Sequence, residues 1–159
     1  MQIAEEKLTF YYNGNNQKVP AYQLIEAALE DRGDYLVEFY NEFLIDVYVL
    51  LDNPNSKYIA IDWDNTVSAD PVFFIDLIKK FQKVGYTPFI CSLRAPDKEN
   101  ITEIKSVLEA RNITIYLTDG QDKYGHMKNL GIDVHLWIDD FYPSICRETC
   151  PLLIKNGIE

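Results

Sequence analysis

Short apolar runs alternate with longer amphipathic segments from residue 58 to the end of the chain. Runs of three to five apolar residues, bounded by turn residues, are typical of strands buried on both faces of a parallel sheet. The predicted strands are Tyr58–Ile61, Thr87–Cys91, Ile113–Leu117 and Val134–Ile138, with an added edge strand at Leu152–Ile154. Because amphipathic segments separate these runs, the pattern predicts an α/β fold with a doubly wound, mostly parallel sheet.

The amphipathic segments carry signals for helix ends. Asp70 followed by Pro71 is typical of an N-cap and a first helical residue, and Gly85 is typical of the end of the same helix. A second helix is predicted over 97–111 and a short third one over 123–130. Each helix therefore falls between two predicted strands, as a parallel sheet requires.

The segment before residue 58 has a different pattern, and we expect residues 1–57 to form an extension packed on a core of residues 58–159. An extension of this length is too short to bury a core of its own. Its predicted elements are a β-hairpin strand over Lys7–Tyr12 with a turn at Asn13–Asn16, a helix over Ala21–Glu30 and a buried amphipathic helix over Tyr35–Leu51.

The composition excludes several classes of protein. The 159 residues are 47% hydrophobic, which excludes a disordered or low-complexity chain. There are 25 acidic and 15 basic residues, and the net charge of −10 disfavours nucleic acid and anionic membranes as partners. No apolar run approaches the roughly 20 residues of a membrane helix, the first residues do not resemble a signal peptide, and the three cysteines do not suggest a disulfide framework. We therefore expect a cytoplasmic protein, and the oligomeric state stays open.

Carboxylates directly follow two of the predicted strands. Asp62 and Asp64 come after the first strand, Asp139 and Asp140 come after the fourth, and Ser92 ends the second. The carboxyl ends of parallel strands meet at one edge of the sheet, where ligands bind in such folds. Carboxylates held this close repel one another, and a bound Mg²⁺ would relieve the repulsion. Mg²⁺ takes oxygen ligands and usually binds through one or two carboxylates together with a substrate phosphate. The sequence therefore predicts a Mg²⁺ site for a phosphorylated substrate.

Asp is common in turns for conformational reasons, so a single acidic pair is not specific. In this order, however, the segments resemble the haloacid dehalogenase superfamily. Ile59–Thr66 resembles its first motif, an apolar run followed by Asp-x-Asp-x-Thr, and Leu136–Asp140 resembles its fourth. Phe89–Ser92 resembles the second motif, and Lys123 the third, a lysine that opens the helix before the last strand. The resemblance covers about residues 58–145 and implies a Rossmann-like fold.

The resemblance also implies a function, that of a Mg²⁺-dependent phosphohydrolase that cleaves a phosphomonoester through an aspartyl-phosphate. Asp62 would be the nucleophile, and Asp64 would protonate the leaving oxygen and then activate water. Ser92 would hydrogen-bond a phosphoryl oxygen, and Lys123 would pair with Asp62 and with the developing charge. The implied metal shell is Asp62, Asp64, Asp139 and Asp140.

Two assignments within this scheme stay open. Asp140 is favoured as a direct metal ligand, with Asp139 as a ligand or a supporting group. Lys123 is favoured as the lysine of the third motif, and Lys128 competes with it, although a cation near a helix C-terminus is favourable for other reasons.

The residues expected around the substrate phosphate are Asn65, Thr66 and Arg94. Asn65 stands where the family usually has Gly, and Asn tolerates the left-handed conformation that the turn needs. Arg94 has two interpretations of equal weight, because its planar guanidinium suits a phosphate and is also common on surfaces.

Family members often carry a cap domain between these motifs. Here Ser92 lies 28 positions after Asp64, and Lys123 lies 31 positions after Ser92, enough for one helix and one strand in each case. The resemblance therefore implies a capless type with an open site, whose relatives act on macromolecular ends, phosphoproteins or phospholipids. The N-terminal segment or another subunit could instead cover the opening and select a small phosphate ester.

Other functions compete with this hypothesis. A non-catalytic phosphate- or partner-binding module is disfavoured because both Asp62 and Asp64 are present, and a phosphatase for nucleic-acid ends is disfavoured by the net charge. In a phospho-receiver the acidic pair comes first in the chain, the phosphorylated Asp follows and the lysine comes last. Here Lys123 precedes the acidic pair Asp139 and Asp140, so the chain order disfavours a receiver. A cysteine-based phosphatase fails because Cys91 has no arginine six positions later.

Overall fold

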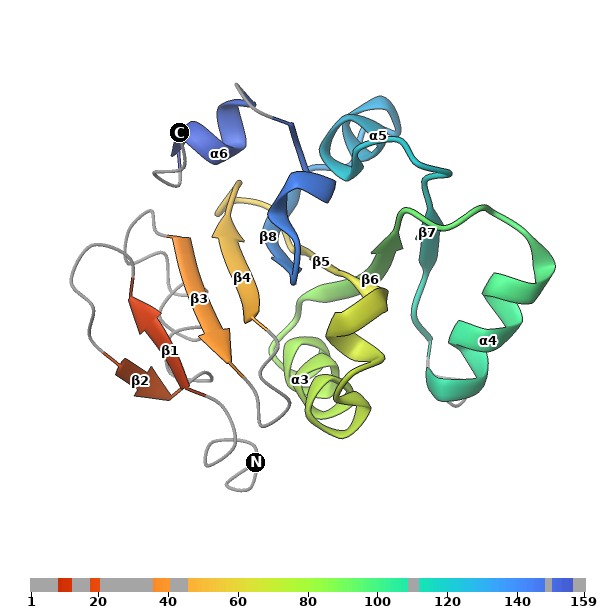
Figure 1. Cartoon of the computed structure of the whole chain (residues 1–159), viewed down its shortest axis with the longest axis horizontal. Helices are drawn as coiled ribbons and strands as arrows, with labels where there is room; N and C mark the ends of the chain where they lie inside the picture. The colour runs from red at the N-terminus through yellow and green to blue at the C-terminus, as the bar shows by residue number, and fades with distance from the viewer. Residues whose placement is uncertain are drawn as a thin grey trace.

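In the computed structural model, the described residues are 9–12, 18–20, 36–40, 46–108, 112–147 and 150–155, with side chains from residue 47 onward. Within these ranges the protein is an α/β structure with one mixed sheet of eight strands, in the order β2-β1-β3-β4-β8-β5-β6-β7 (Figure 1). The strands are β1 (Thr9–Tyr12), β2 (Lys18–Pro20), β3 (Leu36–Tyr40), β4 (Asp46–Leu51), β5 (Tyr58–Ile61), β6 (Thr87–Ser92), β7 (Ile115–Leu117) and β8 (Val134–Asp139).

The sheet has a parallel part and an antiparallel part. β8, β5, β6 and β7 run parallel, as the pattern after residue 58 predicts. β4 pairs antiparallel with β8, and β3, β1 and β2 continue outward as antiparallel neighbours. The predicted hairpin is confirmed by the pairing of β1 with β2. The strands before residue 58 therefore lengthen the sheet of the core, and the prediction of a mostly parallel sheet holds only for the strands after it.

Helices pack on both faces of the sheet around β5 (Figure 1). They are α3 (Pro71–Lys83), α4 (Lys98–Leu108), α5 (Lys123–Asn129) and α6 (Pro151–Lys155), with short helical turns at Trp63–Val67 and Tyr142–Ser144. α3 and α4 share an apolar cluster with Ile61 of β5, whereas α5 and α6 share a second cluster with Ala60. Successive side chains of a strand point to opposite faces, so the two clusters lie on the two sides of the sheet. No helix in the described ranges is long and apolar enough to cross a membrane.

The predicted ends of α3 are confirmed. The Asp70 carboxylate accepts a hydrogen bond from the Phe73 backbone N–H at 3.4 Å, and Pro71 is the first helical residue. Gly85, just beyond the last turn, has a φ of 97°, a conformation that costs other residues energy. α3 therefore begins soon after β5, and the acidic segment between them is short.

The helix predicted over Tyr35–Leu51 is wrong, because the described part of this segment forms β3 and β4. β4 lies inside the sheet, where Val49 and Leu51 join one apolar cluster and Leu50 joins the other. A strand buried on both faces is apolar at nearly every position, so spacings of three and four arise by coincidence. The β-branched and aromatic content of the segment is the more informative signal.

The edge strand predicted at Leu152–Ile154 is also wrong, because these residues lie in α6. Pro151 opens the helix, where its missing N–H needs no partner. Leu152 and Leu153 are buried against the sheet, and Ile154 is exposed.

A disulfide joins Cys146 to Cys150 in the segment that leads into α6, and Cys91 is a buried free thiol. The turn predicted at 13–16 and the helix predicted over 21–30 lie outside the described residues.

Candidate active site

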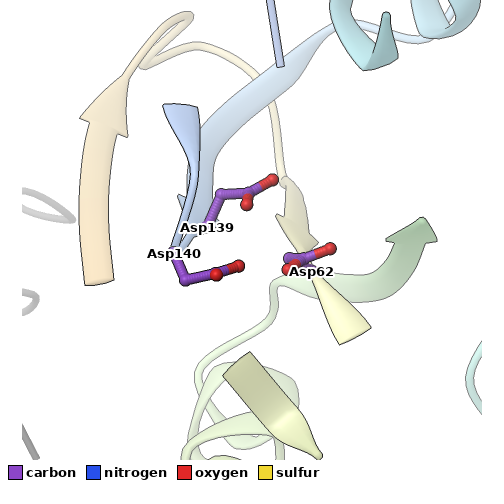
Figure 2. Close-up of side chains that lie close together, drawn as sticks. All are labelled: Asp62, Asp139 and Asp140. Carbon is purple, nitrogen blue, oxygen red and sulfur yellow. The ribbon is translucent and has the colours of Figure 1, made fainter. Parts of the chain in front are cut away.

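The carboxyl ends of β5, β6 and β8 meet at one edge of the sheet. Ile61 pairs with Ile138 of β8 on one side and with Ile90 of β6 on the other. The Asp62 backbone N–H donates to the Ile138 carbonyl at 2.9 Å, so the residue after β5 stays in register with the end of β8. Figure 2 shows the side chains of Asp62, Asp139 and Asp140 converging from these two strand ends. The parallel register therefore produces the predicted cluster.

A buried lysine lies within this cluster. Lys123 is the first residue of α5 and is only 1% exposed. Its ammonium group donates to Asp62 Oδ1 at 2.7 Å and to Asp139 Oδ2 at 2.5 Å. Lys128 instead pairs with Asp133 on the surface, at 2.8 Å. The structure thus brings Lys123, and not Lys128, into the site.

The two acids at the end of β8 have different surroundings. Asp139 is almost fully buried and accepts hydrogen bonds from Lys123, from the Ser144 hydroxyl at 3.0 Å and from the Phe141 backbone N–H at 3.0 Å. Asp140 is half-buried, and its Oδ1 lies 3.3 Å from the Thr66 hydroxyl. Asp139 therefore already accepts three hydrogen bonds, and Asp140 is the more open carboxylate.

Thr66 lies between two of the carboxylates. Its hydroxyl is 3.2 Å from Asp62 Oδ2 and 3.3 Å from Asp140 Oδ1, and the residue is fully buried. One hydroxyl proton can serve only one of these acceptors at a time. Thr66 therefore holds the two carboxylates close together and lies behind them.

The turn after β5 aims Asp64 toward the neighbouring strand end. Asn65 has a φ of 60°, the left-handed conformation predicted for it, and its N–H donates to the Ser68 hydroxyl at 2.9 Å. Arg94, just after β6, grips both oxygens of Asp64, with Nη2 at 2.7 Å from Oδ1 and Nε at 3.0 Å from Oδ2. Arg94 also donates to Glu103 Oε2 at 2.7 Å. Its guanidinium is therefore engaged by protein carboxylates.

Burial dominates the electrostatics of the cluster. It raises the pKa of Asp62 from 3.8 to about 7 and that of Asp139 to about 6, although Lys123 opposes both shifts. It also raises the pKa of Asp140. For Lys123, burial favours the neutral amine, but the charges of Asp139 and Asp62 outweigh it and raise the pKa. The lysine is therefore charged, and the carboxylates bind protons tightly when no other cation is present.

A pocket of about 340 Å³ opens above the cluster. It is lined by Asp62, Asp64, Asn65, Ser92, Leu93, Lys123, Asp139, Asp140, Phe141 and Ser144. Two of the residues expected around a phosphate lie outside this lining, because Thr66 is buried beneath the carboxylates and Arg94 is bound to Asp64. The other predicted site residues all face one cavity.

Three of the carboxylates could share a metal ion. Asp62, Asp139 and Asp140 each offer an oxygen atom, and these atoms lie within 4.8 Å of one another. Carboxylate oxygens are the ligands that Mg²⁺ prefers in proteins. The charged groups of the site are the carboxylates of Asp62, Asp64, Asp139 and Asp140 and the cations of Lys123 and Arg94. Arg94 also pairs with the Glu103 carboxylate, so the carboxylates outnumber the cations and a divalent cation would reduce the net negative charge.

Three lining residues were not predicted from the sequence, namely Ser144, Leu93 and Phe141. Ser144 follows Asp139 by five positions and donates to it through the turn at Tyr142–Ser144. Leu93 and Phe141 directly follow predicted site residues in the chain, and this adjacency is the only signal that could have identified them.

Comparisons of this chain with protein-family models, with curated proteins and with solved structures give no match. A functional assignment therefore depends on the residues of the site and their geometry.

Proposed function

We propose that the protein is a Mg²⁺-dependent phosphohydrolase that cleaves phosphomonoesters through an aspartyl-phosphate on Asp62. The observation that carries the proposal is the buried ammonium of Lys123, which bridges Asp62 and Asp139 at the floor of an open pocket. A buried charge network of this kind is costly for folding. Its location in the pocket favours a catalytic role over a structural one.

The order of these residues along the chain supports the same proposal. The segments Ile59–Thr66, Phe89–Ser92 and Leu136–Asp140 resemble haloacid dehalogenase motifs, and in the structure each contributes a residue to the pocket lining. With helices on both faces of the parallel strands, we take the fold after residue 58 to be Rossmann-like and doubly wound. The described residues between these motifs form no additional domain, and the proposed enzyme is of the capless type.

The proposed reaction divides a difficult hydrolysis into two steps. A carboxylate oxygen of Asp62 forms a bond to phosphorus while the bond from phosphorus to the leaving alcohol breaks. Asp64, after taking up a proton from solvent and giving up one of its two bonds to Arg94, passes that proton to the leaving oxygen. Asp64 then removes a proton from water, whose oxygen bonds to phosphorus and releases Asp62 and inorganic phosphate. Lys123 stays charged throughout and stabilises the negative charge next to Asp62.

The donor set fits a hard divalent cation. Asp140 is the best direct ligand together with Asp62, because Asp139 already accepts three hydrogen bonds. A bound Mg²⁺ would polarise a phosphoryl oxygen and offset the charge of the carboxylates. Ser92, 1% exposed at the end of β6, would orient the phosphate from the opposite side.

The decisive experiment is a phosphatase assay with an aryl phosphate and Mg²⁺. We expect hydrolysis that EDTA abolishes, and Asp62→Asn should lower kcat by at least about a thousandfold, since loss of the nucleophile removes the covalent route. The matched control is Asp119→Asn, because Asp119 is exposed and has a φ of 54°, which Asn tolerates. Wild-type protein that is inactive on nucleotides, sugar phosphates, phosphopeptides and aryl phosphates would instead favour a non-catalytic binding module.

A further inference from the structure

Two large apolar side chains are exposed at the mouth of the pocket. Phe141 is 58% exposed and Leu93 is 38% exposed, and both line the cavity. They follow β8 and β6, the strands on either side of β5, so they flank the position of Asp62. Exposing apolar surface to water costs free energy, and this free energy is recovered when a ligand covers the two side chains.

The backbone at both positions is held by hydrogen bonds. The Phe141 N–H donates to Asp139 Oδ1 at 3.0 Å, and its carbonyl accepts from the Ser144 backbone N–H at 3.0 Å. The Leu93 carbonyl accepts from the Gly120 N–H at 2.9 Å. Both residues are thus presented by ordered segments, and a ligand would not have to order these segments when it binds.

The charges of the pocket restrict the ligand further. Lys123 is held between Asp62 and Asp139, and the guanidinium of Arg94 is held by Asp64. No cation in the described lining is left to receive a second anionic group. The carboxylates would repel such a group, so a substrate that carries a carboxylate or a second phosphate on its leaving group is disfavoured.

On the basis of the phosphatase function proposed above, we propose that the substrate is a phosphomonoester whose leaving alcohol is uncharged and carries an apolar ring held between Phe141 and Leu93. The cavity of about 340 Å³ is at the lower end of the range for small-molecule sites, roughly 300–1,000 Å³. It has room for a phosphoryl group and one ring. The two side chains are therefore specificity-determining residues, which select the leaving group and take no part in bond breaking.

The test compares three esters on the 159-residue chain with Mg²⁺: benzyl phosphate, ethyl phosphate and 4-carboxybenzyl phosphate. The alcohols are of similar leaving ability, so differences in kcat/KM report on the pocket. We expect benzyl phosphate to exceed each of the other two by about tenfold. Phe141→Ala and Leu93→Ala should reduce the preference for benzyl over ethyl phosphate to within about twofold, whereas Val72→Ala, an 82% exposed residue on α3, should preserve it.

A second measurement does not depend on turnover. Calorimetric titration of benzylphosphonate and ethylphosphonate, which cannot be hydrolysed, should show the same preference and its loss in Phe141→Ala. Equal kcat/KM and affinity for the benzyl and ethyl compounds, or a preference unchanged in Phe141→Ala, would overturn the inference and leave the phosphatase function standing. Binding of benzylphosphonate that depends on Phe141, without hydrolysis of any ester, would support the apolar subsite and overturn the phosphatase function.

Discussion

Lys123 is the residue on which the integrity of the site depends. It is buried at the start of α5, with Asp62 and Asp139 as ion-pair partners at 2.7 and 2.5 Å. Removing one partner from a buried charge network lowers the stability of the fold more than replacing the whole network with apolar residues, because the remaining charges stay desolvated and unpaired. Lys128, on the same helix, forms an exposed pair with Asp133 and makes a natural comparison.

We therefore predict that Lys123→Met lowers the free energy of unfolding by about 3–5 kcal/mol. Lys128→Met should change it by less than about 1 kcal/mol, because exposed ion pairs contribute little. Urea unfolding of the metal-free proteins, followed by circular dichroism, measures both values. Equal stability of the two variants would show that the buried carboxylates do not need the ammonium group.

The Arg94 side chain links three elements of the fold, namely β6, the turn after β5 and α4. It follows β6, grips Asp64 in the turn after β5, and donates to Asn100 and Glu103 of α4. A planar guanidinium that bonds both oxygens of a carboxylate fixes the orientation of that carboxylate, which an ammonium group cannot do. Arg94 is therefore a positioning residue for Asp64. The sequence also allowed a role in binding the substrate phosphate, and kinetics of an Arg94 variant distinguish the two roles.

We expect Arg94→Lys to lower kcat by about tenfold or more while KM changes by less than about twofold, since misorientation of the proton donor affects the chemical step. Steady-state kinetics with an aryl phosphate separates the two parameters. Arg147→Lys, at an exposed position outside the pocket lining, is the matched control. A rise in KM with unchanged kcat would assign Arg94 to phosphate binding instead.

The molecule as a whole is acidic, yet its strongest concentration of described carboxylates is held at one edge of the sheet. The net charge is −10, and four of the acids contribute to one pocket. A bound dication would relieve their repulsion and stabilise the folded protein, because unfolding disperses the ligands. Stability of the whole chain should therefore respond to both metal and pH.

The pKa values of Asp62, about 7, and Asp139, about 6, are raised above 3.8 in the metal-free folded protein. The stabilisation that protonation gives is thus full below about pH 4 and is lost as the pH rises through 6 and 7. We predict that the free energy of unfolding of the metal-free protein falls between pH 5 and pH 8 as Asp62 and Asp139 lose their protons. Mg²⁺ should raise the melting temperature more at pH 8 than at pH 5, where it competes with protons.

Thermal unfolding with EDTA or with Mg²⁺ at each pH measures this effect. NaCl at matched ionic strength is the control, because salt alone screens the repulsion within an acidic protein. An equal shift with Mg²⁺ at both pH values would mean that the ion does not bind these carboxylates.

Much of the fold after residue 58 could be predicted from local patterns. β5, β6 and β8 are short apolar runs, and Asp70, Pro71 and Gly85 mark the ends of α3. The convergence of Asp62 with Asp139 also followed, because parallel strands that end in acids bring them to one edge. These inferences succeed where the decisive interactions are between near neighbours in the chain or follow from strand direction.

Other features could not be predicted, because they depend on distant pairing. The segment that contains Val49 and Leu50 has both helical spacing and strand composition, and its pairing with β8, nearly ninety positions later, selects the strand. Leu152 and Leu153 likewise lie in a short helix and pack against the apolar cluster that contains Leu50 and Ala60 of the sheet. An apolar triplet in the sequence does not distinguish such a helix from an edge strand. In both cases tertiary contacts outweigh the local preference.

Local sequence patterns were enough to predict the alternation of strands and helices after residue 58 and the left-handed turn at Asn65. They also predicted the strand-end positions of Asp62, Asp64, Ser92, Asp139 and Asp140. These depend on periodicity, turn chemistry and chain order, which are local. The tertiary structure was needed to choose Lys123 over Lys128, and to show that Arg94 binds Asp64 and that Phe141 and Leu93 line the pocket. Those contacts join residues that are far apart in the chain, and the direction of a long side chain is set by the partners that packing supplies.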